Sequence, residues 1–248
     1  MYNNRRISVV ISTYKEKGSI KKVIDDFFDT GFVDEVLVVN NNAEIGTDEE
    51  VSQTRARLVY ELRQGYGHGY QKGIQETSGD YIVLCEADGT FSAKDIERFL
   101  VFAKDFPVVL GSRTNQSTLL DMKAMNPIRR IVDVIYAKVI EVIFATKTLT
   151  DIGCTYKLFD KKILRGLENK FKTRDSLFAL ELTLLTVVNR IPFVEIPVTF
   201  RERIGVSGTI PSFRKLIYWA IRIWIYIWVY WWRWQFRKFP PKAEKFNQ

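Results

Sequence analysis

The alternation of short apolar runs with helical patterns over the first 110 residues most constrains the fold of this chain. Apolar runs typical of strands that are buried on both faces of a sheet lie at residues 7–12, 36–39, 81–85 and 108–110, with another strand expected at 57–62. Between them, residues 19–28 and 93–103 carry apolar side chains at helical spacing. This order predicts an α/β fold with a mostly parallel sheet.

Polar residues follow the strands expected at residues 7–12, 36–39 and 81–85. They are Thr13, Glu16, Asn40, Asn41, Glu86 and Asp88. Because ligands of parallel sheets bind at the carboxyl ends of the strands, we expect these side chains to line a site. The pair Glu86-x-Asp88 suits Mg²⁺ or Mn²⁺, which prefer oxygen ligands. A solvated turn is the alternative, since Asp-Gly is common in turns.

Two local features shape the helices that follow the strands. Ser19 is a candidate cap for the helix that contains residues 19–28, and Gly31 ends it. The glycine-rich residues 65–69 predict a turn ahead of a helix at residues 70–77. They lack the spacing of a dinucleotide-binding fingerprint, so turn geometry explains the glycines.

The net charge of +8 belongs to one end of the chain. Residues 201–248 contain ten Lys or Arg against two Glu, together with all six tryptophans, so residues 1–200 are neutral. No basic cluster lies on this neutral part, which argues against nucleic-acid binding. The sequence therefore predicts a globular unit at 1–210 and a basic, aromatic unit at 211–248.

The C-terminal unit has the pattern of a helix at a membrane surface. Residues 216–232 are apolar or aromatic except for Arg222, and a charge there disfavours a membrane span. A helical projection puts four basic residues on one stripe, and three lysines follow: Lys215, Arg222, Arg233 and Arg237, then Lys238, Lys242 and Lys245. We expect interfacial anchoring to anionic lipid. A single span and a helix that joins copies into a homo-oligomer are the alternatives.

Cysteine usage and the first residues bear on the compartment. Cys85 and Cys154 make neither a disulfide framework nor a metal-ligand spacing, which favours a reducing compartment. The polar residues 1–6 precede an apolar run too short for a secretory signal. We therefore expect the cytoplasmic face of a membrane.

Several motifs in order resemble those of family-2 glycosyltransferases. They are residues 7–16 (ISVVISTYKE), 34–43 (DEVLVVNNNA), 65–89 (GYGHGYQKGIQETSGDYIVLCEADG) and 109–114 (VLGSRT). Beyond residue 120 the chain resembles the dolichyl-phosphate mannose synthase-like branch of that family. The matching stretches are 126–130 (NPIRR), 150–160 (TDIGCTYKLFD) and 178–208.

This resemblance implies a GT-A fold, an α/β domain that binds a nucleotide-diphosphate sugar. The nucleotide would be bound by Thr13, Tyr14, Glu16, Asn40, Asn41 and Ala87. Glu86 and Asp88 would hold a divalent cation, Mg²⁺ or Mn²⁺. The catalytic group would comprise Asp88, Arg113 and Asp151, and the acceptor phosphate would lie among Arg113, Arg129, Arg130, Arg201, Arg203 and Ser207.

The chain departs from the family pattern at two places. The family usually has Asp-Asp-Gly-Ser after the second strand, where this chain has Asn40-Asn41-Asn42-Ala43. Asn can donate as well as accept hydrogen bonds, which leaves the choice of nucleobase open. The first carboxylate of the usual Asp-x-Asp motif is Glu86, which preserves the charge on a longer side chain.

Together these features predict an inverting glycosyltransferase that moves a hexose from a GDP- or UDP-sugar to a polyprenyl or dolichyl phosphate. A phosphate acceptor is already an anion and needs positioning by Arg, which matches phosphate bidentately. Asp151 could instead serve as the base for a hydroxyl acceptor on a glycan. A third hypothesis is a catalytically silent membrane scaffold that binds nucleotide sugars.

Overall fold

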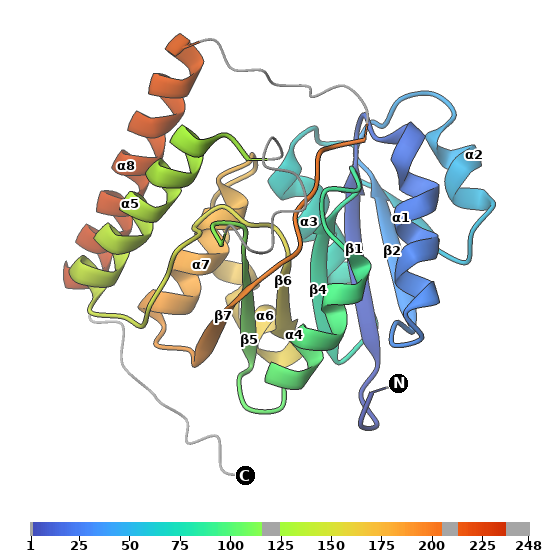
Figure 1. The fold of residues 1–248 in the computed structure, drawn as a ribbon, viewed down its shortest axis with the longest axis horizontal. Coiled ribbons are helices and arrows are strands. Elements are labelled where there is room, and N and C mark those ends of the chain that lie inside the picture. The colour runs from blue at the N-terminus through green and yellow to red at the C-terminus, as the bar shows by residue number, and fades with distance from the viewer. Residues whose placement is uncertain (1, 116–124, 205–212, 237–248) are drawn as a thin grey trace.

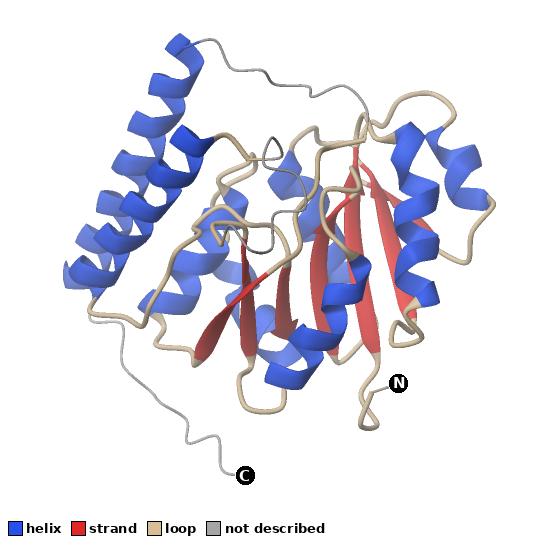
Figure 2. Ribbon diagram, viewed as in Figure 1, coloured by secondary structure: helices blue, strands red, loops and turns tan. Residues whose placement is uncertain are grey.

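A mixed sheet lies at the centre of the molecule, with helices on both faces (Figures 1 and 2). The structure is a computed structural model that describes residues 2–115, 125–204 and 213–236. Its strands are β1 (Ile7–Thr13), β2 (Glu35–Asn40), β3 (Arg57–Tyr60), β4 (Tyr81–Glu86), β5 (Val108–Ser112), β6 (Lys157–Asp160) and β7 (Phe193–Pro197). They are ordered β3-β2-β1-β4-β6-β5-β7.

The sheet is mostly parallel, which confirms the prediction. Only β6 runs antiparallel to its described neighbours, β4 and β5. Thr13 of β1 pairs in register with Asn40 of β2, and Ser12 pairs with Glu86 of β4. The carboxyl ends of these three strands therefore meet at one edge of the sheet, where the predicted nucleotide and metal residues lie.

Helices cover both faces of the sheet. They are α1 (Lys17–Asp29), α2 (Thr47–Ser52), α3 (Tyr66–Glu76), α4 (Ile96–Phe102), α5 (Pro127–Phe144), α6 (Lys161–Leu167), α7 (Phe178–Val188) and α8 (Phe213–Phe236), with short 3₁₀ turns at Ala93–Asp95 and Glu168–Lys170. Side chains along β1 point alternately to the two faces of the sheet, and each face has its own hydrophobic core. Val9 and Ile11 pack with α1 and α4, whereas Val10 packs with α3, α6 and α7. The helix expected at residues 93–103 is confirmed as the first 3₁₀ turn and α4.

The glycine-rich stretch is helical, so its interpretation as a turn ahead of the helix was wrong. Helix α3 begins at Tyr66, four residues earlier than expected. A Cβ at Gly69 would lie 2.0 Å from Ser12 Oγ, and one at Gly73 would lie 2.2 Å from Val10 Cγ1. These glycines let α3 lie directly against β1, a close approach that no larger residue allows.

Ser19 does not cap α1, because the helix already begins at Lys17. The Ser19 side chain is buried in the first turn and donates to the carbonyl oxygens of Glu16 (3.2 Å) and Ala87 (2.7 Å). Burial of a hydroxyl requires such partners. The hydroxyl therefore ties α1 to the segment that carries Glu86 and Asp88.

Helix α8 packs against α5 and α7 and lies beside α5 in Figure 1. Ile227 is fully buried, and the hydroxyls of Tyr226 and Tyr230 donate to Glu181 Oε1 of α7 at 2.7 and 2.8 Å. Glu181 is itself fully buried and also accepts from the amides of Lys172 and Thr173, so the two tyrosines of α8 complete the hydrogen bonding of this carboxylate. The boundary expected at residue 210 falls outside the described residues.

The polar side of α8 divides between the body and solvent. Arg222 bonds Asp175 Oδ2 at 2.7 Å and lies over the Trp219 ring, 4.8 Å from its centroid, whereas Arg233 is exposed. Arg237 and the three lysines beyond it lie outside the described residues. Within the described ranges, no helix has the length and hydropathy needed to cross a membrane.

Candidate active site

The loop after β1 is organised by the Glu16 carboxylate. Its Oε2 accepts hydrogen bonds from the backbone amides of Tyr14 (2.7 Å) and Lys15 (2.8 Å) and from Thr13 Oγ1 (3.3 Å). These bonds fold the loop over the end of the strand and leave Tyr14 exposed. The predicted nucleotide residues Thr13, Tyr14 and Glu16 therefore lie together at the sheet edge.

The two asparagines after β2 are both engaged within the protein. The Asn41 amide is buried and donates to the carbonyls of Glu61 and Arg63, both at 2.8 Å, while its Oδ1 accepts from Gly65 N at 2.8 Å. Asn41 thus fixes the segment that leads into α3. Asn40 donates to Asp48 Oδ1 at 2.6 Å and is less buried.

Asp88 and Glu86 lie at the end of β4, close to the loop after β1. Asp88 is only 3% exposed; its Oδ1 accepts from Thr90 N (3.0 Å) and Thr90 Oγ1 (2.7 Å). Glu86 Oε1 accepts from Thr155 Oγ1 at 2.6 Å. Ala87 is buried between them, and its carbonyl oxygen accepts from Ser19 Oγ at 2.7 Å.

The electrostatics of this pair fit a divalent cation. Burial and the negative charge of Asp88 raise the pKa of Glu86 to about 7. A cation beside the pair would relieve this repulsion on Glu86, and both carboxylates offer the oxygen ligands that Mg²⁺ and Mn²⁺ prefer. No cluster of three or more His, Cys, Asp or Glu suited to a metal occurs in the described ranges. A cation held by Glu86 and Asp88 would therefore need further oxygens, which a bound diphosphate supplies.

Arg113 and Asp151 form a buried ion pair beyond the end of β5. Arg113 Nε donates to Asp151 Oδ2 and Nη2 donates to Oδ1, both at 2.8 Å. Burial works against ionisation of Asp151, but the charge and hydrogen bonds of Arg113 outweigh it and lower the pKa of Asp151 to about 2. A carboxylate held in this way is a weak base, so its observed contacts are those of a residue that positions Arg113.

The remaining predicted arginines lie in two places. Arg129 and Arg130 are in the first turn of α5, which Asn126 caps by accepting from Ile128 N at 2.8 Å. Arg201 and Arg203 follow β7, and Arg203 pairs with Glu16 and Asp88. Ser207 lies outside the described residues.

Sequence reasoning missed three side chains that support the site. Thr155 donates to Glu86 and also contacts the Tyr66 hydroxyl, which joins α3 to Glu86. Asp133 of α5 is buried 3.6 Å from Arg113 Nη2, and its Oδ2 has no hydrogen-bond partner. Its pKa is raised to about 6, mainly by burial and also by the charge of Asp151. The available signal for Asp133 was an acidic residue that shares helical spacing with the apolar Tyr136, Ala137 and Ile140.

The family model of Glycosyl transferase family 2 matches residues 8–167. The chain belongs to glycosyl transferase family 2. The enzyme is 28% identical to glycosyltransferase AglJ of Haloferax volcanii over 109 residues, which cover 43% of this chain and 36% of AglJ. It is 22% identical to dolichyl-phosphate beta-glucosyltransferase of Saccharomyces cerevisiae over 224 residues, 79% of this chain and 67% of that protein.

Solved structures show the same fold. The crystal structure of glucosyl-3-phosphoglycerate synthase from Mycobacterium tuberculosis aligns with a TM-score of 0.70 at 15% identity, covering 92% of this chain and 81% of that one. A complex of the same synthase with Mn²⁺, UDP and glucosyl-3-phosphoglycerate aligns with a TM-score of 0.69, again at 15% identity, over 92% and 80% of the two chains. The predicted GT-A fold is confirmed, and the enzyme is a glycosyltransferase.

Proposed function

We propose that the enzyme transfers a hexose, with inversion, from a nucleotide-diphosphate sugar to a polyprenyl phosphate at the cytoplasmic face of a membrane. The observation that carries this proposal is the arrangement at the sheet edge. Glu86 and Asp88 offer cation ligands. Asp151, the carboxylate that could act as a base, is instead held by two hydrogen bonds from the Arg113 guanidinium. Such a site suits a nucleophile that is already an anion. The names of the yeast and other dolichyl-phosphate glucosyltransferase relatives support the same acceptor class.

The reaction requires one bond to form and one to break at the anomeric carbon. An acceptor phosphate oxygen attacks the face opposite the nucleotide, and the bond from this carbon to the diphosphate breaks, so the electron pair leaves with the nucleoside diphosphate. The divalent cation supplies charge stabilisation to that leaving group. Guanidinium groups orient the two phosphates, and the loop held by Glu16 covers the nucleotide.

Acceptor assays test this function. The enzyme, Mn²⁺ or Mg²⁺ and a panel of radiolabelled UDP- and GDP-hexoses are incubated with a polyprenyl phosphate or with the matched polyprenol that lacks the phosphate. We expect label to enter the organic phase with the phosphate only, and mild acid to release it. Transfer to the polyprenol or to a soluble glycan, without transfer to the phosphate, would contradict the proposal.

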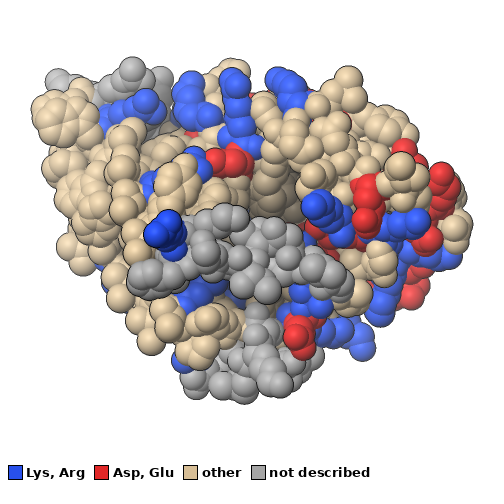
Figure 3. Space-filling view, turned by 90° about the horizontal axis from the view of Figure 1, so that it is seen from above, with Lys and Arg blue, Asp and Glu red and all other residues tan. Residues whose placement is uncertain are grey.

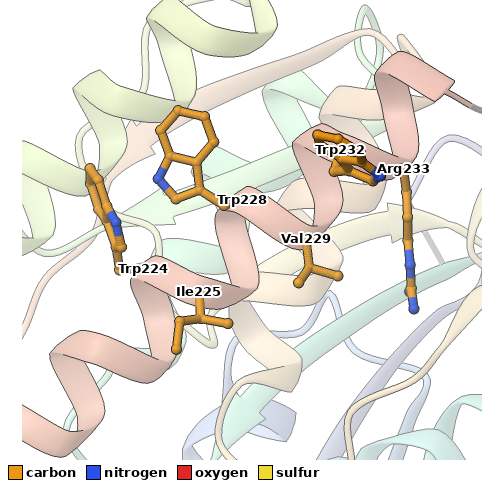
Figure 4. Close-up of a pocket in the computed structure, with 6 residues that line it drawn as sticks. All are labelled: Trp224, Ile225, Trp228, Val229, Trp232 and Arg233. Carbon is orange, nitrogen blue, oxygen red and sulfur yellow. The ribbon is translucent and has the colours of Figure 1, made fainter.

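The membrane part of the proposal rests on the outer surface of α5 and α8, here called the α5–α8 face. Its exposed apolar residues are Ile128, Ile131, Ile135 and Val142 of α5 and Ile221, Trp224, Ile225, Trp228, Val229 and Trp232 of α8. Part of it forms a hollow of about 350 Å³ beside Arg233, where the rings of Trp224 and Trp228 lie 5.8 Å apart (Figure 4). So large an apolar patch marks a docking surface.

The charge of the α5–α8 face favours an anionic membrane as its partner. Helix α8 contains no Asp or Glu and carries Arg214, Lys215, Arg222 and Arg233. Of the acidic side chains visible in Figure 3, most lie at the end of the molecule away from α8, on the side of α1 and α2. Aromatic and aliphatic side chains with flanking Arg and Lys suit the headgroup region. The two buried free cysteines support the cytoplasmic face.

A glutamate on the α5–α8 face should weaken membrane binding. Ile131→Glu and Ile225→Glu each replace a side chain that is more than half exposed, so folding is spared. In sedimentation with vesicles of phosphatidylcholine and phosphatidylglycerol, we expect each to lower the partition coefficient about tenfold, because an inserted apolar group is lost and a repelled charge is added. Val101→Glu, which places the same charge on exposed α4, is the matched control. Equal loss in all three variants, or none in the first two, would refute this contact.

A further inference from the structure

The segment after β7 is hydrogen-bonded to the turn that carries Asp88. Phe200 bridges to Phe91, and the amide of Arg201 donates to the carbonyl of Thr90 at 2.8 Å. The amide of Ile204 then donates to the carbonyl of Asp88 itself at 3.0 Å. Because these main-chain bonds lie on both sides of Arg203, they hold it beside Asp88.

The Arg203 guanidinium bridges the two acidic elements of the site. Its Nη2 lies 2.8 Å from Glu16 Oε1, and its Nε lies 3.3 Å from Asp88 Oδ2. Asp88 Oδ1 is taken by Thr90, so Oδ2 is the oxygen that Asp88 has left for a cation. The Arg203 side chain is one third exposed and can therefore move into solvent without breaking the core.

We infer that Arg203 occupies the cation position of the ligand-free enzyme and competes with the divalent cation for Asp88. This inference rests on the proposed function, in which Asp88 helps to bind the cation. One oxygen cannot serve both partners at full strength, and a guanidinium beside a divalent cation is repelled at such distances. Cation binding therefore displaces Arg203 from Asp88.

The displaced guanidinium stays within reach of Glu16, beside the expected nucleotide pocket. The donor diphosphate is the anion that enters there, and Arg matches phosphate oxygens bidentately. Arg203 thus exchanges a carboxylate for a phosphate when donor and cation bind together. In this way one side chain offsets part of the carboxylate charge of the site and favours joint binding of the two ligands over binding of the cation alone.

Mn²⁺ titration of the full-length enzyme without nucleotide, followed by electron paramagnetic resonance of free Mn²⁺, tests this competition. We expect Arg203→Gln to bind Mn²⁺ about fivefold more tightly than the unsubstituted enzyme, the factor that corresponds to losing a half-buried ion pair. Arg203→Met, which keeps the aliphatic stem, should do the same. Arg201→Gln is the matched control: it removes the same charge from the same segment, and the Arg201 guanidinium donates to Ser92 Oγ at 3.5 Å. Its affinity should change less than about twofold.

The outcomes separate this inference from the proposed function. The competition is overturned if both Arg203 variants bind Mn²⁺ no more tightly than the unsubstituted enzyme or than Arg201→Gln. This conclusion holds even if the unsubstituted enzyme binds Mn²⁺ with UDP and transfers hexose. If no variant binds Mn²⁺, with or without UDP, the cation assignment at Asp88 fails, and the competition fails with it. Thermal unfolding of each variant verifies that the titrated protein is folded.

Discussion

Asp88→Asn is expected to lower kcat for hexose transfer by about a thousandfold, because a metal-binding charge worth several kcal/mol to the leaving group is lost. The substitution is nearly isosteric. The amide oxygen can still accept the two bonds from Thr90, so the turn after β4 should keep its shape. A loss of turnover with an unchanged Tm would therefore report on chemistry and not on folding.

Two comparisons make the Asp88 result specific. Asp105→Asn neutralises an exposed carboxylate after α4 and should leave kcat within about twofold, as distant surface substitutions do. Adding a chelator in excess should reduce the unsubstituted enzyme to the level of Asp88→Asn and leave that variant unaffected. Full transfer by Asp88→Asn in the presence of chelator would show that the reaction does not need this site.

Features set by local pattern were predictable from the sequence. Apolar runs located β1 to β5 but neither β6 nor β7, and the rule that ligands gather at the carboxyl ends of parallel strands placed Thr13, Asn40 and Glu86 at one site. Their register pairing shows why this works: β1, β2 and β4 are neighbours. The error at α3 has the opposite cause. Gly69 and Gly73 serve a close contact with β1, and glycines that allow such contacts look in sequence like glycines that make turns.

Features set by pairing between distant segments were not predictable. The resemblance predicts that Arg113 binds phosphate, yet its bidentate partner Asp151 lies 38 residues away, and nothing in the spacing reveals that the two neutralise each other. Arg203 lies 187 residues from Glu16 and meets it only because β7 returns to the sheet beside β5. The side of α8 that binds Glu181 also depends on a contact between helices, which periodicity alone does not specify.

The Asp151–Arg113 pair supplies the largest expected effect on stability. Asp151→Ala should lower the free energy of unfolding by about 3–5 kcal/mol, the usual cost of leaving a buried charge without its partner. Four donors converge on this carboxylate: the amide, Nε and Nη2 of Arg113, and the amide of Gly153 at 3.0 Å. Asp133, 3.6 Å from Arg113, is too distant to replace them. Urea unfolding measures the loss, with Asp105→Ala as the exposed carboxylate control.

The pH dependence of that loss distinguishes a structural carboxylate from a catalytic base. Asp151 has a pKa of about 2 in the folded chain, below its ordinary value of 3.8. Its contribution to stability is therefore complete above about pH 4 and disappears as the pH falls through about 2. The difference in unfolding free energy between the unsubstituted enzyme and Asp151→Ala should widen as the pH falls from 7 to about 5, because protonation of Asp133 relieves its repulsion with Asp151 only in the unsubstituted enzyme, and it should shrink below about pH 4. If Asp151→Ala instead unfolds like the unsubstituted enzyme but loses transfer in a pH-dependent way, Asp151 acts as a base, and the acceptor is a hydroxyl.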